Sequence, residues 1–388
     1  MKQHLRGITA ALTALVLGLT VLSGCRSAVM AGDKATAAVL QGEEYSLEEA
    51  KLYIYASQYM IEQDSEVIIS YMYQSYDAFW EYEQNGQSYY QMNYIEGLNK
   101  LFQTKRLVKK AAADGIALTD EEKQKVEDAI VKFKEEEKNV VAASGCSEEL
   151  LRQFVTENAI AQKTYLAMIA DVDTTFDEAE FRRKNVEGLY VTALTEKPAA
   201  EAESTAESSE ETAESTEAAE PKTYTEEEQK AAREEAVTVI ETRLKAGESV
   251  SDILASFEGS ETVRVTSTGA LTLSPEDAAE EGAEITSYRQ LGWTMSTDDV
   301  ETFESTASTG SVTTYILRCV NDDDPDLRAS AEKSELVSRK NTLFGERYQE
   351  LLKQYPDYHV YEEVVNTIKK VIPMYESEMM TQQESAAE

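Results

Sequence analysis

Histidine is nearly absent from this chain, which has only two among 388 residues. One of them, His4, lies in a segment that we expect to be removed, which leaves His359. An HExxH zinc site needs two histidines, and a Ser-His-Asp triad needs one beside a serine and an acid. The phosphate-binding and nucleophile motifs GxxxxGK[ST], GxGxxG and GxSxG are also missing. Hydrolytic zinc and triad chemistry are therefore poorly supported, and no cofactor or metal is implied.

Positive charge is scarce as well. Lys and Arg number 37 against 73 Asp and Glu, so the formal net charge is −36. A surface this acidic repels phosphate backbones, which excludes nucleic acid as a partner. It also argues against electrostatic attachment to anionic lipid.

Cysteine occurs three times, and Cys25 has the most informative context. A basic start is followed by an apolar run over 8–22, too short to span a bilayer comfortably, and then by Leu-Ser-Gly-Cys. This resembles the lipobox of bacterial lipoprotein precursors, which implies lipidation of Cys25 and extracytoplasmic anchoring to the cell membrane. An ordinary secretory signal that contains a cysteine is the alternative. Cys146 and Cys319 could pair in an envelope location, but two separate thiols are favoured.

Helix-start signals recur after the signal segment. Ser46, Thr119 and Thr225 are each followed three residues later by Glu, which predicts reciprocal capping of a helix N-terminus. Apolar residues at helical spacing follow each pair. Gly145 is placed to end one helix and Ser147 to begin the next.

The phrases DGIALTDEE, SEELLRQF and FDEAEFRRKN resemble the N-terminal chaperone region of PrsA/SurA-type foldases. The resemblance implies a mostly helical α+β protein with an inserted parvulin-like α+β domain. We expect a signal peptide (1–24), a flexible tether (25–44), a helical chaperone domain (45–185), a degenerate parvulin-like domain (186–325), a helical return (326–373) and a flexible tail (374–388). Residues 196–223, rich in Glu, Ser, Thr and Ala, are expected to be a disordered acidic insertion.

Within 186–325 the resemblance gives an order of elements. Strands are expected at 186–194 and 315–320, with β-rich sequence over 262–273. Helices are expected at 226–246, 250–257 and 298–308. The run Asn-Asp-Asp-Asp-Pro-Asp at 321–326 has the charge of a calcium loop but lacks its ligand spacing, so a turn that caps the next helix is favoured.

Parvulin-type isomerases place one histidine on the first strand of the domain and another on the last. Neither is present here, and Tyr315 stands near the second position. The barrier to X-Pro rotation is lowered by desolvating and twisting the amide, so the loss need not abolish activity. Isomerase activity therefore stays uncertain, with a weak or inactive scaffold favoured. Trp293, Met295, Phe303 and Tyr315 are the candidate pocket residues, although a domain core explains each equally well.

Tyrosine is concentrated near the start of the folded region, with eleven of the 21 tyrosines between positions 45 and 94. Tyrosine combines apolar area with a hydrogen-bonding tip, which suits a surface that holds many different chains. The candidate contact residues here are Tyr53, Tyr59, Tyr73 and Trp80. Packing between long helices is the alternative.

These patterns favour a lipid-anchored foldase-like chaperone that binds unfolded secreted polypeptides, with a homodimer left open. A true prolyl isomerase with a rearranged pocket is one alternative. A structural or partner-binding envelope lipoprotein is another.

Overall fold

The computed structural model describes residues 34–196 and 223–377, and it confirms the α+β class. The chain forms two compact units. The first consists of Met1–Val172 together with Ser338–Glu388, and the second of Asp173–Val337. The second unit is thus an insertion in the chain of the first. Cys25 and the proposed signal peptide lie outside the described residues, as do 197–222 of the expected insertion, whose flanking Glu196 and Thr223 form an antiparallel bridge.

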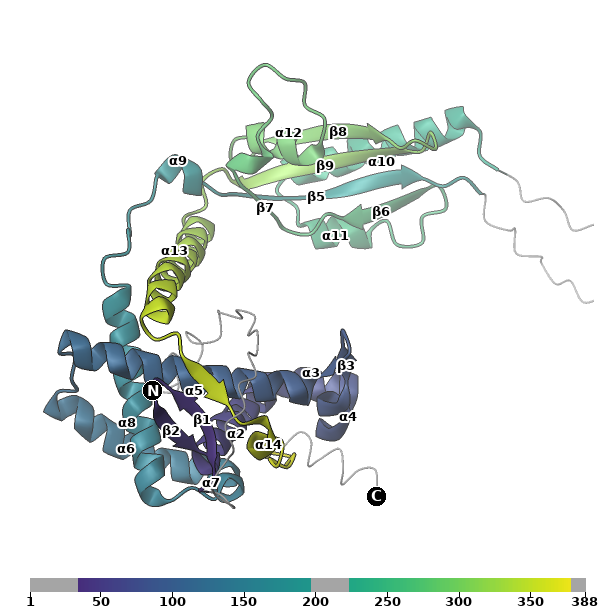
Figure 1. Cartoon of the computed structure of the whole chain (residues 1–388). Coiled ribbons are helices and arrows are strands. Elements are labelled where there is room, and N and C mark those ends of the chain that lie inside the picture. Colours follow the sequence, from purple (N-terminus) through teal and green to yellow (C-terminus); the bar gives the residue numbers. More distant parts are fainter. Residues whose placement is uncertain (1–33, 197–222, 378–388) are drawn as a thin grey trace, which may run out of the picture. The chain divides into compact units, whose positions relative to one another are not determined.

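The first unit is built mainly of helices (Figure 1). Its long helices are α2 (Leu47–Asp64), α5 (Tyr89–Asp114), α6 (Asp120–Glu136) and α8 (Glu148–Met168). The shorter helix α7 (Lys138–Ser144) lies between α6 and α8 in the sequence. Five short elements lie between α2 and α5 in the sequence: α3 (Glu66–Ile68), the π-helix η1 (Ile69–Tyr73), α4 (Tyr76–Glu81), β3 (Glu83–Gln84) and β4 (Gln87–Ser88). Helix α13, Pro325–Gln354, contributes its residues from 338 onward to this unit.

Capping pairs fix several of these helix starts. Thr119 and Glu122 form the predicted reciprocal box, and Gly145 ends α7 in the left-handed conformation that glycine favours. At α2 only half of the predicted box forms. The Ser46 hydroxyl accepts from the Glu49 N–H, but the Glu49 side chain turns inward to Lys105.

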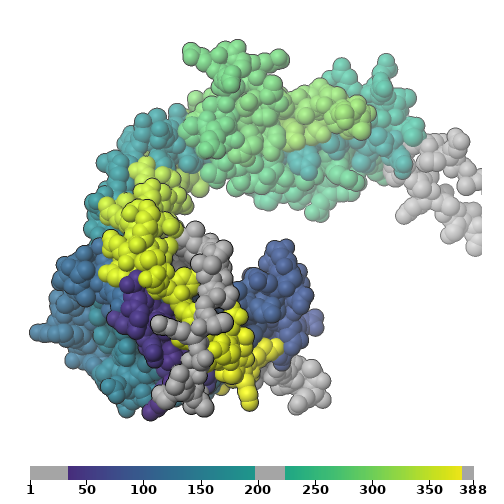
Figure 2. Space-filling view, in the orientation of Figure 1, coloured from purple at the N-terminus to yellow at the C-terminus, as the bar shows by residue number. Residues whose placement is uncertain are grey.

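The expected tether over 25–44 is partly wrong, because residues 36–40 and 43–46 form strands. Strand β1 (Thr36–Leu40) pairs antiparallel with β2 (Glu43–Ser46) and with β10 (Tyr358–Val360). Ala37, Ala38 and Leu40 are buried, so this short run has enough apolar surface to join the core. Figure 2 shows the N-terminal strands, in purple, beside C-terminal residues in yellow.

The C-terminal return is also not wholly helical. After α13 the chain forms β10 and then a single helical turn, α14 (Glu362–Val365). Residues 374–377, expected in a flexible tail, are packed: Met374 and Ser377 are buried. The backbone N–H groups of Met374 and Tyr375 both donate to the Glu62 carboxylate, which fixes this segment against α2.

A buried ionic cluster joins three helices of the first unit. Lys105 on α5 is only 5% exposed, and its ammonium lies 2.5 Å from the Glu49 carboxylate of α2. It also pairs with Glu157 of α8. The same ammonium lies 4.9 Å from the centre of the Tyr45 ring, a favourable cation–π distance. The Lys105 ammonium serves both carboxylates, because a buried charge needs an opposite charge beside it, and the three groups together keep one negative charge in excess.

At the break between α6 and α7, the surroundings of one carboxyl group, that of Glu137, disfavour its ionised form. Glu137 sits at this break, and its side chain makes no capping hydrogen bond to α7. Desolvation, with the neighbouring Glu136 charge, raises the pKa of Glu137 to about 8. Because this folded-state pKa lies above the unfolded value, the folded chain holds its proton more tightly. Stability is therefore lost as pH rises from about 4.5 to about 8.

Glu137→Gln removes that ionisation. We expect the variant to be more stable than the parent above pH 8 by on the order of 1–2 kcal/mol, because water reaching the half-buried group reduces the full value. At pH 4, where the parent is protonated in both states, the two should match. Thermal unfolding measured across pH 4 to 9 tests this, and a gain that is independent of pH would contradict the assignment.

The second unit is an antiparallel sheet with helices (Figure 1). Its strands are β5 (Lys184–Ala193), β6 (Val263–Ser267), β7 (Leu271–Leu273), β8 (Val300–Thr306) and β9 (Val312–Asn321). Their order is β6-β5-β9-β8, and β7 pairs with the start of β5. Its helices are α9 (Glu178–Phe181), α10 (Glu226–Lys245), α11 (Val250–Ala255) and α12 (Tyr288–Thr294), with a 3-10 turn η2 (Pro275–Asp277).

The helix expected over 298–308 is wrong, because Val300–Thr306 is strand β8. Asp298 has a φ of 71°, which interrupts any helix at its start. The following residues are mostly β-branched, aromatic or alternating polar, and pair along β9 from Val300 to Thr306. The strands and helices expected at 186–194, 315–320, 226–246 and 250–257 are confirmed with small changes of boundary.

Candidate functional site

The described residues contain no group of three or more His, Cys, Asp or Glu side chains arranged to hold a metal ion. At the acidic run after β9, the Asp324 carboxylate accepts from the N–H groups of Asp326 and Leu327, at 3.0 and 3.1 Å. It therefore starts α13, as the turn interpretation predicts. Cys146 and Cys319 are free, and burial raises the pKa of both thiols, which makes them poor nucleophiles.

Aromatic side chains form a row across the sheet of the second unit. Tyr190 of β5 pairs directly with Tyr315 of β9, which in turn pairs with Phe303 of β8. Ring centres lie 5.6 Å apart for the first pair and 6.5 Å for the second. Residues opposite each other on neighbouring strands share a face of the sheet, so the register alone brings the three rings together.

Helix α12 adds a fourth ring. Tyr288 stacks on Tyr315 with centres 4.3 Å apart and planes within 10°. All four side chains are half-buried. Partial burial and the neighbouring tyrosines raise the pKa of Tyr315 above its ordinary value. We call these four residues, Tyr190, Tyr288, Phe303 and Tyr315, the aromatic row.

The other face of the sheet is closed. Leu189, Val191 and Ile316 alternate with the row along their strands and are buried against α10, through Ala236, Ile240 and Leu244. A strand buries alternate residues on one face. The sheet thus offers one face to its own core helix and retains half-exposed rings on the other.

Of the other two expected pocket residues, Met295 is buried and Trp293 is half-buried. Met295 is 2% exposed and packs with Val186, Leu273, Leu317 and Cys319. Lys184 is buried, donates to the Met295 carbonyl, and places its ammonium 5.4 Å from the centre of the half-buried Trp293 ring. Two of the four candidate pocket residues, Phe303 and Tyr315, therefore belong to the aromatic row. Trp293 and Met295 lie outside it.

In the first unit, three of the four expected contact residues are core. Tyr53, Tyr59 and Trp80 are buried. Tyr53 packs edge-on to Phe154 at 4.8 Å, and the Trp80 indole donates to Glu62. Only Tyr73 is half-exposed, in a group of rings with Phe79, Tyr82 and Tyr89, and a hydrogen bond with Tyr89 raises its pKa to about 12.

An exposed apolar segment, not predicted from the sequence, lies beside Tyr73. Tyr71 and Met72 are 75% and 73% exposed, and Val67 and Ile68 are also exposed. They occupy α3 and the π-helix η1, which a regular helical pattern does not predict. The signal that could have found them is the absence of polar residues over 67–73 apart from Ser70.

Within the residues described, no helix has the length and apolarity needed to cross a membrane. No protein-family model matches the chain, and no curated protein matches it. Among solved structures it is similar to foldase protein PrsA from Lactococcus lactis, with 13% identity, a TM-score of 0.25, and coverage of 86% of this chain and 99% of that one. It is similar to foldase protein PrsA from Streptococcus pneumoniae at 12% identity and a TM-score of 0.21, covering 78% and 97%.

Proposed function

We propose that this chain is a lipid-anchored extracytoplasmic protein that binds unfolded polypeptides in the manner of a chaperone, with weak or no prolyl isomerisation. The aromatic row carries the proposal. Four half-exposed rings over one sheet face supply apolar contact area, and the three tyrosines among them add hydroxyl tips, which suits sequence-tolerant binding of extended chains. The exposed segment 67–72 offers further apolar surface.

The proposal is tested with the chain lacking residues 1–25, in two assays on one preparation. Aggregation of a chemically unfolded client should be suppressed, while a proline-limited refolding reaction should keep its uncatalysed rate. Faster refolding at substoichiometric protein would favour the isomerase alternative. No effect in either assay would contradict the proposal. Anchoring is tested by the mass of native membrane protein, in which Cys25 without acyl groups would contradict the lipoprotein assignment.

Removing the central ring should weaken client binding. Tyr315 touches all three other members of the row, so Tyr315→Ala is expected to raise the Kd for a reduced, alkylated client by about three- to tenfold. Tyr288→Ala removes a ring from α12 without altering a strand, and should act in the same direction. Tyr224→Ala, at a half-buried tyrosine outside the row, is the control. Fluorescence anisotropy gives the affinities, and equal affinities for all variants would exclude the row.

A further inference from the structure

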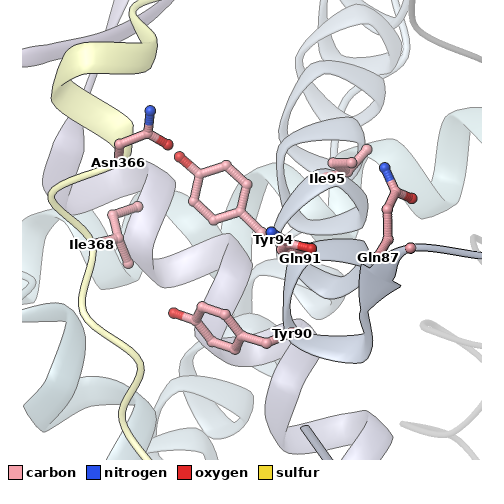
Figure 3. A pocket seen from close by; sticks show the side chains of 8 residues that line it. Gln87, Tyr90, Gln91, Tyr94, Ile95, Asn366 and Ile368 are labelled. Atoms are coloured by element: carbon pink, nitrogen blue, oxygen red, sulfur yellow. The ribbon is translucent and has the colours of Figure 1, made fainter. Parts of the chain in front are cut away.

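A groove opens in the first unit between the start of α5 and the chain that follows α14 (Figure 3). Its volume is about 530 Å³. Gln87, Tyr90, Gln91 and Tyr94 line it from β4 and α5, and Asn366 and Ile368 line it from the other side. The Tyr90 and Tyr94 rings extend from α5 toward the segment that carries Asn366 and Ile368. Pockets of this size hold small molecules or a few residues of a peptide.

Two hydroxyls in this groove lack partners. The Tyr90 and Tyr94 oxygens are shielded from solvent and make no hydrogen bond in the described protein. The two residues are one helical turn apart on α5, so their rings lie on the same face. A buried polar group without a partner is costly, and such groups call for an explanation. Asn366 is exposed, so its side chain can rotate aside to open a path to the Tyr94 hydroxyl.

The groove lining selects against charge. Its polar groups are primary amides and hydroxyls, joined by the apolar Ile95 and Ile368. An acidic group, Glu362 at the start of α14, lies close enough for its charge to act on Tyr94. Anions are therefore repelled. An extended peptide backbone presents N–H and C=O groups in alternation, which amide and hydroxyl side chains can both satisfy.

We propose that this groove binds an extended, uncharged stretch of polypeptide, with the Tyr90 and Tyr94 hydroxyls hydrogen-bonding its main chain and Ile95 and Ile368 contacting an apolar side chain. This inference rests on the proposed polypeptide-binding function and assigns a second, separate binding site for it. It differs from the aromatic row in its chemistry, because it recognises main-chain amide groups in addition to apolar area.

The test uses the double variant Tyr90→Phe/Tyr94→Phe, which removes the two hydroxyls and keeps the rings. The probe is a fluorescently labelled nonapeptide without charged residues and with one central Leu, added to the chain lacking residues 1–25. We expect the Kd to rise about tenfold, as loss of two neutral hydrogen bonds implies. The melting temperature should be unchanged or higher, because no internal hydrogen bond is lost. Tyr165→Phe is the control, because it removes a hydroxyl from a buried tyrosine elsewhere in the first unit. It should leave the Kd for the nonapeptide unchanged.

The outcomes separate this inference from the proposed function. Unchanged peptide affinity in the double variant, with aggregation still suppressed, would overturn the groove assignment alone. Failure of the parent chain both to bind the peptide and to suppress aggregation would overturn both. A fall in melting temperature without a change in affinity would show that the hydroxyls are structural. Displacement of the probe by a neutral oligosaccharide but not by unlabelled peptide would reassign the groove to carbohydrate.

Discussion

Lys105→Met is expected to destabilise the first unit by about 3–5 kcal/mol, the usual cost of leaving a buried charge without its partner. Lys105 is the cation between Glu49 and Glu157, and it joins α2, α5 and α8. Burial already raises the pKa of Glu49, and Lys105 opposes that rise. Without the ammonium, Glu49 and Glu157 would repel each other inside the protein. Urea unfolding followed by circular dichroism measures the loss.

A matched control lies on the same helix. Lys110 pairs with Asp114 at 2.7 Å on the surface of α5, and Lys110→Met should change stability by less than about 0.5 kcal/mol. Adding Glu49→Gln and Glu157→Gln to Lys105→Met should recover much of the loss, since no buried charge then remains. The Lys105→Met variant should also regain stability as pH falls, because Glu49 takes up a proton. Equal losses for Lys105→Met and Lys110→Met would contradict the role of burial.

Glu62→Ala is the second large effect, expected to cost about 3–5 kcal/mol. Four N–H donors converge on this buried carboxylate. Gln58 and the Trp80 indole donate to one oxygen at 2.8 and 2.7 Å. The Met374 and Tyr375 backbone groups donate to the other at 2.6 and 2.7 Å. Alanine would remove the acceptor of all four donors, of which only the Gln58 amide has a second partner, the Val371 carbonyl, and it would open a cavity under the C-terminal segment.

Glu62→Gln tests the two oxygens separately. The glutamine oxygen can keep the Gln58 and Trp80 contacts, whereas its NH₂ group would face the Met374 and Tyr375 donors. Amide hydrogen exchange should then accelerate at positions 374 and 375 and remain slow within α2. Glu81→Ala is the control, because Glu81 reaches the same segment through Lys370 but at the surface. A uniform acceleration across the whole unit would show that Glu62 does not act locally.

The sequence predicted most helix starts because a capping pair is a local device. Thr119 with Glu122 and Thr225 with Glu228 form as expected, and Glu122 keeps its bond to the Thr119 N–H although Lys163 also donates to its carboxylate, at 2.6 Å. Ser46 with Glu49 forms only in part because Lys105, distant in sequence, competes for Glu49. That competition is tertiary, and no local pattern contains it.

The failures have the same origin. Residues 36–40 are small and look like a tether until β10, more than three hundred residues later, supplies a pairing edge. Val300–Thr306 becomes a strand because β9 lies beside it. Phe303 and Tyr315 were candidates on their own, but Tyr190 and Tyr288 required the strand register and the position of α12. Tyr90 and Tyr94 could be seen as part of a tyrosine cluster, but their missing hydrogen bonds could not.

The nested path of the chain sets an order on its folding during synthesis. Strand β1 needs β10, and Glu62 needs positions 374 and 375, so the first unit cannot be completed before nearly the whole chain has emerged. The second unit contains only residues 173–337 and is complete earlier. Contacts that close over so long an interval form slowly. Until then the residues of the first unit that pack against Tyr361, Val365, Ile368 and Met374 stay uncovered, so this protein itself exposes apolar surface while it is being made.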